Sequence, residues 1–184
     1  SLMLERMFRY AASVDTSDAH GTSRSNYTRF GLNIERKNIT LLAVPTMYAV
    51  ANGGKRSYID ESYGVTEYNS TRDVRTRTLI RNTTIPHRRK TMENVTKYLT
   101  PKLYDETIID EYIISPFNKE NRRFYKYSTT FLLDGTARIE FTPRRKNTQL
   151  VSGTALLDYA TGRIIECNIL GEYDMIDFNL NLTM

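Results

Sequence analysis

The side chains that most often perform covalent or acid–base chemistry are scarce in this sequence of 184 residues. It contains two histidines, His20 and His87, and one cysteine, Cys167. A catalytic thiol needs a lowered pKa, and a transition-metal site needs several histidines or cysteines at suitable spacing. Neither histidine has such a neighbour. Cys167 lies between Glu166 and Asn168 on a predicted strand. This position favours a small buried residue over a nucleophile.

Acidic side chains are the remaining candidates for catalysis or cation binding. They form adjacent pairs at residues 60–61, 105–106 and 110–111. Neighbours on a strand face opposite ways, so such a pair does not converge on one ligand. Glu106 and Asp110 would share a face if their segment were helical, and paired carboxylates can transfer protons or bind a cation. Since no phosphate-binding loop, metalloprotease motif or nucleophile elbow is present, we expect no catalytic residue, metal or cofactor, and no enzyme activity.

Basic residues are abundant and unevenly distributed. The net charge is +5, and residues 72–90 contain seven Lys or Arg against one acid. By contrast, residues 158–184 contain one Arg against five acids. Two smaller basic clusters lie between these regions: Arg122, Arg123 and Lys126, then Arg138, Arg144, Arg145 and Lys146.

These clusters, together with 13 tyrosines, have three interpretations. Cations interleaved with aromatic rings are typical of single-stranded nucleic-acid binders. Arginines at alternate strand positions are also common simply because they are solvated. The intermediate interpretation is contact with anionic lipid headgroups. For that contact the candidates are Arg75, Arg77 and Arg81, which share one face of a predicted strand.

The N-terminal half is predicted to begin with an amphipathic helix, because Leu4, Met7, Phe8 and Ala11 recur at helical spacing. A polar loop over 13–26 and a strand from Tyr27 follow. The apolar segment 41–50 ends at an Asn-Gly-Gly turn, so we expect it to pair with a strand over 57–63. A further strand is predicted over 74–81 and a helix over 89–99, whereas 103–114 suits a helix or a strand.

The last sixty residues predict an antiparallel meander. Strands are expected over 125–133, 137–142, 150–158, 163–170 and 175–182, because apolar and polar residues alternate and the connections are short. Asp134 and Gly135 predict a two-residue turn, and Gly162 takes a position of positive φ in another. The whole chain, 1–184, fits one domain. We predict an α+β fold with a curved antiparallel sheet partly covered by helices.

Four stretches carry a family resemblance: residues 114–121 (ISPFNKEN), 139–153 (IEFTPRRKNTQLVSG), 158–164 (DYATGRI) and 171–176 (GEYDMI). Together they resemble a group of Bacteroidetes cell-envelope proteins, in which such a region lies near a carboxypeptidase-regulatory-like domain and an outer-membrane β-barrel. More loosely, the pattern is similar to the LolA-like fold of outer-membrane lipoprotein sorting. That fold is a half-barrel closed by helices around an apolar cavity for acyl chains.

The resemblance implies a periplasmic, outer-membrane-associated domain that belongs to a longer envelope protein. We expect its concave face to bind a lipid-like ligand, such as a lipoprotein acyl chain, or a partner segment. The residues expected to line the cavity are the inward strand positions Ile139, Phe141, Val151, Leu157, Ile176, Phe178 and Leu180. One alternative is a structural module attached to an outer-membrane barrel of the same polypeptide. A second is single-stranded nucleic-acid binding, although we expect no nucleic-acid partner.

Overall fold

The computed structural model describes residues 1–14, 22–36, 55–70, 73–84, 103–109, 111–173 and 176–183. Its elements are α1 (Leu2–Val14), β1 (Thr22–Arg36), β2 (Lys55–Ser70), β3 (Asp73–Thr83), the 3₁₀-helix η1 (Lys119–Phe124), β4 (Tyr125–Phe131), β5 (Thr136–Pro143), β6 (Ser152–Asp158), β7 (Ile164–Tyr173) and β8 (Ile176–Thr183). No helix in these ranges is long and apolar enough to cross a membrane.

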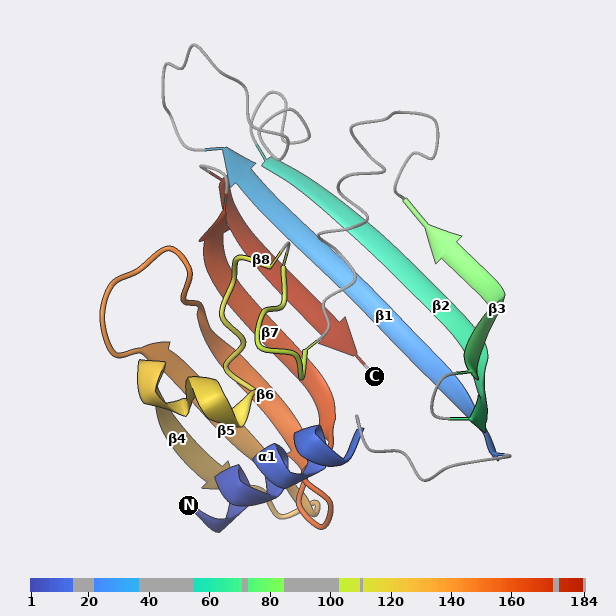
Figure 1. The fold of residues 1–184 in the computed structure, drawn as a ribbon. Helices are drawn as coiled ribbons and strands as arrows, with labels where there is room; N and C mark the ends of the chain where they lie inside the picture. The colour runs from blue at the N-terminus through green and yellow to red at the C-terminus, as the bar shows by residue number, and fades with distance from the viewer. Residues whose placement is uncertain are drawn as a thin grey trace.

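The strands form one open antiparallel sheet in the order β3-β2-β1-β8-β7-β6-β5-β4 (Figure 1). The predicted C-terminal meander, β4 to β8, is confirmed. Gly162 has a φ of 83°, as the predicted turn required. The β4–β5 connection is longer than predicted, spanning 132–135, with Gly135 at φ 80°. Strand β8 then pairs with β1, placing Leu32 opposite Leu180, so the two ends of the chain join within the sheet.

The N-terminal strands differ from the prediction in two ways. Strand β1 begins at Thr22 instead of Tyr27, because its polar first residues pair with β2 as far as Tyr68. The predicted pairing of 57–63 with 41–50 is wrong, since β2 pairs with β1 on one side and β3 on the other. Residues 41–50, the turn at 52–54 and the helix predicted over 89–99 lie outside the described residues.

Over β4–β8, one face of the sheet, here called the inner face, is covered by α1 and by the segment 103–118 (Figure 1). The predicted helix is confirmed: Leu4, Met7, Phe8 and Ala11 are all buried. It packs tightly, since a Cβ on Gly162 would lie 2.5 Å from the backbone of Arg6. The opposite face is called the outer face below.

The described residues of the segment 103–118 form neither the predicted helix nor the predicted strand; they form turns with one isolated bridge between Thr107 and Ile114. Side-chain hydrogen bonds to the backbone replace a regular ladder. Ser115 Oγ donates to Leu103 O, and Asn118 Nδ2 donates to Tyr104 O at 3.0 Å. Asn121 Nδ2 donates to Glu106 O and Ser115 O. These bonds satisfy polar backbone that would otherwise be costly to bury.

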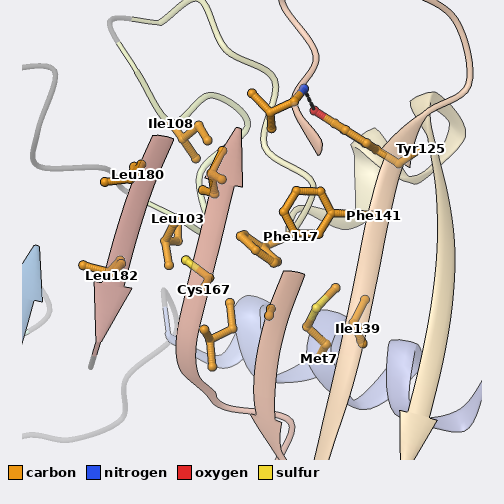
Figure 2. Close-up of a cluster of buried hydrophobic side chains, with 14 of the residues drawn as sticks. Met7, Leu103, Ile108, Phe117, Tyr125, Ile139, Phe141, Cys167, Leu180 and Leu182 are labelled. Carbon is orange, nitrogen blue, oxygen red and sulfur yellow. Dashed lines mark hydrogen bonds between the residues drawn. The ribbon is translucent and has the colours of Figure 1, made fainter. Parts of the chain in front are cut away.

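The core lies between this covering layer and β4–β8 (Figure 2). Phe117 projects from the covering segment, with its ring centroid 5.3 Å from that of Phe141 on β5. Tyr125 donates its hydroxyl proton to Ile114 O and accepts from Val151 N, which joins β4, the covering segment and the loop before β6. Among the described residues, every buried side-chain nitrogen or oxygen has a hydrogen-bond partner.

Candidate functional site

The residues predicted to line a ligand cavity lie in the hydrophobic core. Their side chains are at most 4% exposed where described: Ile139, Phe141, Val151, Leu157, Phe178 and Leu180. Ile176 is in β8, but its side chain lies outside the described residues. The space beside Phe141 is occupied by Phe117 and Tyr125 (Figure 2). The side chains of the inner face therefore pack mainly against the protein's own covering layer.

Cys167 is 5% exposed and belongs to the same core, as the sequence predicted. Burial disfavours the charged thiolate and raises the thiol pKa to about 12. At pH 8, a thiol with that pKa is ionised in about one molecule in 10⁴, against roughly a quarter for a free thiol. The environment is the opposite of what a nucleophilic cysteine needs.

We therefore expect native Cys167 to react with a thiol reagent such as 5,5′-dithiobis(2-nitrobenzoate) at least ~10³-fold more slowly than the urea-unfolded chain at pH 8. Absorbance at equal protein concentration measures both rates. Because the chain has a single cysteine, the signal has one source. Rapid labelling of the native protein would contradict the buried position.

The acidic pairs do not form a site among the described residues. The segment around Glu106 is not helical, so the helical spacing to Asp110 does not apply, and Asp110 lies outside the described residues. Asp60 instead makes a two-pronged contact with Arg81, Nε to Oδ1 at 2.8 Å and Nη2 to Oδ2 at 3.2 Å. No group of three or more His, Cys, Asp or Glu within the described ranges could hold a metal ion. His20 and His87 lie outside those ranges.

The three candidate arginines of β3 do not share a face, contrary to the prediction. The pairing with β2 shifts between Tyr63, opposite Ile80, and Gly64, opposite Thr78. Leu79 is therefore an extra residue, and such a bulge reverses the alternation beyond it. Arg75 and Arg77 face outward, whereas Arg81 lies on the other face with Asp60. The strand itself was predicted correctly, but the bulge had no sequence signal.

The outer face carries a row of amide side chains across β1, β7 and β8. Asn168 Nδ2 donates to Asn179 Oδ1 and Asn181 Oδ1, both at 2.6 Å. Asn33, opposite Asn179, accepts from Ser57 Oγ at 2.6 Å. Two pockets lie along this row, and Asn181 and Thr183 line both of them. The amides mainly satisfy one another, so the row is suited to cross-strand support and to weak polar contacts.

Two basic clusters that are distant in sequence meet at one end of the β4–β5 hairpin. Tyr125 pairs with Pro143, Arg144 N donates to Phe124 O at 2.9 Å, and Arg144 Nε donates to Tyr125 O at 2.9 Å. We call this surface the basic end; it consists of the exposed residues Lys119, Arg122, Arg123, Lys126, Arg144, Arg145 and Lys146. The acids near it include Glu5, bound to Arg122 at 2.6 Å, Glu120, and Glu140, which is exposed on β5 opposite Ser128.

Sequence reasoning identified both clusters but missed that they combine. The signal was present, because a hairpin turn at Asp134 and Gly135 places residues 122–126 opposite 142–146. Arg138, which was grouped with the second cluster, lies further along β5 opposite Thr130. The resulting site is electrostatic. It can attract an anionic group, but it holds neither an acid–base pair nor a nucleophile.

The basic end adjoins an open edge of the sheet, because β4 is the last strand in the order. Leu132 N donates to Thr136 O, and Arg144 N donates to Phe124 O. Antiparallel geometry then directs the backbone groups of residues 124, 126, 128, 130 and 132 toward β5. The backbone N–H and C=O groups of Tyr127, Thr129 and Phe131 therefore point toward the open edge. No described strand pairs with that edge.

The two edges of the sheet differ in how they discourage pairing. Strand β3 carries Arg75, Arg77 and Arg81 and is interrupted by the bulge at Leu79. Charges and bulges are the usual features that prevent edge-to-edge association. Strand β4 (YKYSTTF) has one charge, Lys126, no proline, and an uninterrupted register with β5. It is the edge better suited to accept another strand.

Comparison with known proteins gives one family and a set of weak structural likenesses. The crystal structure of MucB aligns with 100% of this chain and 58% of its own, at 13% identity and a TM-score of 0.44. The MucA/MucB complex of Pseudomonas aeruginosa aligns over 99% and 57%, at 13% identity and a TM-score of 0.36. The chain thus spans less than two thirds of the length of these structures. No curated protein sequence matches it.

The family assignment covers most of the sheet. The match begins at residue 25, within β1, and ends at residue 181, within β8. It therefore includes β2–β7, the covering segment, the basic end and the open edge of β4. Residues 25–181 match the family of unknown function DUF5686, and this chain belongs to that family.

Proposed function

We propose that this domain is a non-enzymatic binding module that accepts an extended, acidic segment of a protein partner along the edge of β4. The observation that carries the proposal is the regular, nearly uncharged edge of β4 beside the basic end. A strand added to a sheet edge gains affinity from main-chain hydrogen bonds, and neighbouring side chains give it specificity. The packed side chains on the inner face of β4–β8 do not favour a lipid in that part of the sheet.

The charge preference follows from the side chains along the edge. Lys126 projects outward from β4 and is exposed, and Arg122 and Arg144 flank the start of the strand. Half-buried Tyr127 and Thr129 project toward the inner face. A partner strand with carboxylates on one side and β-branched residues on the other would match both sides. Nucleic acid fits less well, because the ring of Phe124 is already under Arg123, at 4.8 Å from its guanidinium.

The location proposed is the periplasmic side of the cell envelope, and the support for it is the resemblance given by the four sequence stretches. The same resemblance supports the finer description of the fold as an α+β half-barrel within a longer outer-membrane protein. A lipid ligand and an attached barrel remain predictions from that resemblance. Fractionation of cells that express the full-length protein tests the location directly.

Thr129→Pro is expected to weaken binding of an acidic strand at least ~10-fold while leaving the fold intact. Proline removes the N–H of Thr129, which points to the open edge, and proline is tolerated at edge positions of this kind. The probe is an eight-residue peptide of alternating Val and Glu, with a Val–Lys peptide as the charge control. Fluorescence polarisation measures binding, and circular dichroism checks the fold.

Thr129→Val is the matched control, because it keeps the N–H and is expected to bind as the parent does. Hydrogen exchange gives a second readout: the peptide should protect the amides of Tyr127, Thr129 and Phe131. The proposal is wrong if Thr129→Pro binds normally or if those amides gain no protection. It is also wrong if sedimentation shows a dimer that Thr129→Pro dissociates, because the edge is then occupied by a second copy.

A further inference from the structure

The other end of the β4–β5 hairpin presents apolar side chains to solvent. Leu133 is fully exposed at 110%, Phe131 is 59% exposed, and Tyr159 in the β6–β7 turn is 40% exposed. We call these three residues the apolar tip. They come from the end of β4 and from two neighbouring turns at the same end of the sheet (Figure 1). Much of each of these side chains is in contact with solvent. Packing in the core therefore does not explain why apolar residues occupy these positions.

The apolar tip is held rigidly by contacts between the two turns. The ring of Phe131 meets that of Tyr159 edge-on, with centroids 5.6 Å apart. Tyr159 N donates to Gly135 O at 3.0 Å, and Asp134 Oδ1 accepts from Thr136 N at 3.0 Å. Gly135 supplies the positive φ that the turn needs. Leu133 is therefore presented outward by a fixed turn.

A cation lies at the base of the apolar tip. Arg6 of α1 donates from Nη1 to Tyr159 O at 2.7 Å, and its guanidinium is 4.7 Å from the centroid of the Tyr159 ring. Leu133 and Phe131 at the extremity, with a tyrosine and an arginine behind them, resemble the order found at a membrane interface, and the exposed carboxylate of Asp134 in the same turn would stay at the level of the headgroups. In that order leucine and phenylalanine enter the acyl region, while tyrosine and arginine remain at the level of the phosphates.

We propose that the apolar tip inserts into the interface of a phospholipid bilayer, with Leu133 and Phe131 among the acyl chains and Arg6 near the phosphates. A stable protein interface buries about 800 Å² on each partner, which three side chains cannot supply. A convex turn also needs no preformed pocket in a fluid bilayer. The basic end and the start of β4 lie at the opposite end of the hairpin, so insertion leaves them accessible.

The absence of tryptophan in the sequence allows a direct test. Leu133→Trp introduces one fluorophore at the apolar tip, and its emission is expected to shift to the blue on addition of phosphatidylcholine–phosphatidylglycerol vesicles. Acyl chains labelled with bromine should quench it. Leu170→Trp is the matched control: Leu170 is 44% exposed on β7, away from the tip, and its emission should not change.

A second variant tests binding without a reporter. Phe131→Ser with Leu133→Ser is expected to lower the vesicle partition coefficient, measured by cosedimentation, by at least ~10-fold, since two apolar side chains no longer leave water. Binding of the parent protein to the vesicles should persist at 0.5 M salt. At that concentration the Debye length is on the order of a few ångströms, so purely electrostatic attachment is lost.

Three results would overturn the inference. The first is unchanged Leu133→Trp emission with vesicles, and the second is normal vesicle binding by the double serine variant. The third is a blue shift in buffer alone that grows with protein concentration, which would assign the apolar tip to contact between copies of the chain. Phe131 is also the last residue of β4, but the serine substitutions keep its backbone N–H and C=O at the edge. Failure of these tests would therefore leave the Thr129→Pro test of the proposed function unaffected.

Discussion

Replacing Phe117 with alanine is expected to lower the free energy of unfolding by about 3–5 kcal/mol. Phe117 is fully buried and meets Phe141 edge-on at 5.3 Å. The change removes most of an aromatic side chain from the centre of the core and leaves a cavity between the covering segment and β5. Urea unfolding followed by circular dichroism measures the effect, with an unchanged m-value as the check on two-state behaviour.

Phe131→Ala provides the matched comparison, because it makes the same chemical change at a residue that is 59% exposed. Its expected effect is below about 1 kcal/mol. If Phe117→Ala is too unstable to study, Phe117→Leu keeps most of the volume and should cost less than alanine. A loss below about 1 kcal/mol for Phe117→Ala would mean that the segment 103–118 does not fill the inner face.

This result bears directly on the function. A carrier of acyl chains needs an apolar space that its own side chains do not occupy. Here the inner-face residues Ile139, Phe141 and Leu157 are fully buried beneath α1 and the covering segment. A large destabilisation by Phe117→Ala would show that this segment is part of the folded core. Among the described residues, the surfaces that we then propose for partners are the edge of β4, the basic end and the apolar tip.

The sequence predicted the C-terminal meander well, because its strands alternate apolar and polar residues and most of the turns between them are short. Gly162 is a good example: its type and place predicted the positive φ that the structure shows. The covering segment could not be predicted in this way. It has no period, since Ser115, Asn118 and Asn121 hold it through side-chain bonds to the backbone.

The candidate surfaces depended on contacts between distant parts of the chain. The basic residues were evident in the sequence. That they meet at the basic end follows only from the strand register, which places Tyr125 opposite Pro143. The identity of the edge strands needed the pairing of β1 with β8, which no local pattern indicates. Arg81 lies on a different face from Arg75 and Arg77 because of the bulge at Leu79, which the sequence does not indicate.

Gly153→Ala and Gly31→Ala make the same chemical change in one sheet but are expected to have very different effects. A Cβ on Gly153 would lie 1.9 Å from the backbone oxygen of Asn168 and 2.9 Å from the ring of Phe141. A Cβ on Gly31 would meet the Cβ of Asn181 at 3.7 Å and its backbone oxygen at 3.9 Å, both ordinary contacts. We expect Gly153→Ala to cost more than about 3 kcal/mol, and Gly31→Ala to be neutral or to stabilise by about 0.4–1 kcal/mol.

The difference has a structural cause that urea unfolding of the two variants can test. Gly153 is opposite Phe141 on β5 and Ile169 on β7, so an added methyl group must displace either the aromatic core or the neighbouring strand. The backbone of β7 cannot move without disturbing its pairing with β8, which connects the meander to β1. If Gly153→Ala does not accumulate as folded protein, Gly31→Ala controls for expression. Equal stability of the two variants would contradict the close approach of β6 and β7 beneath Phe141.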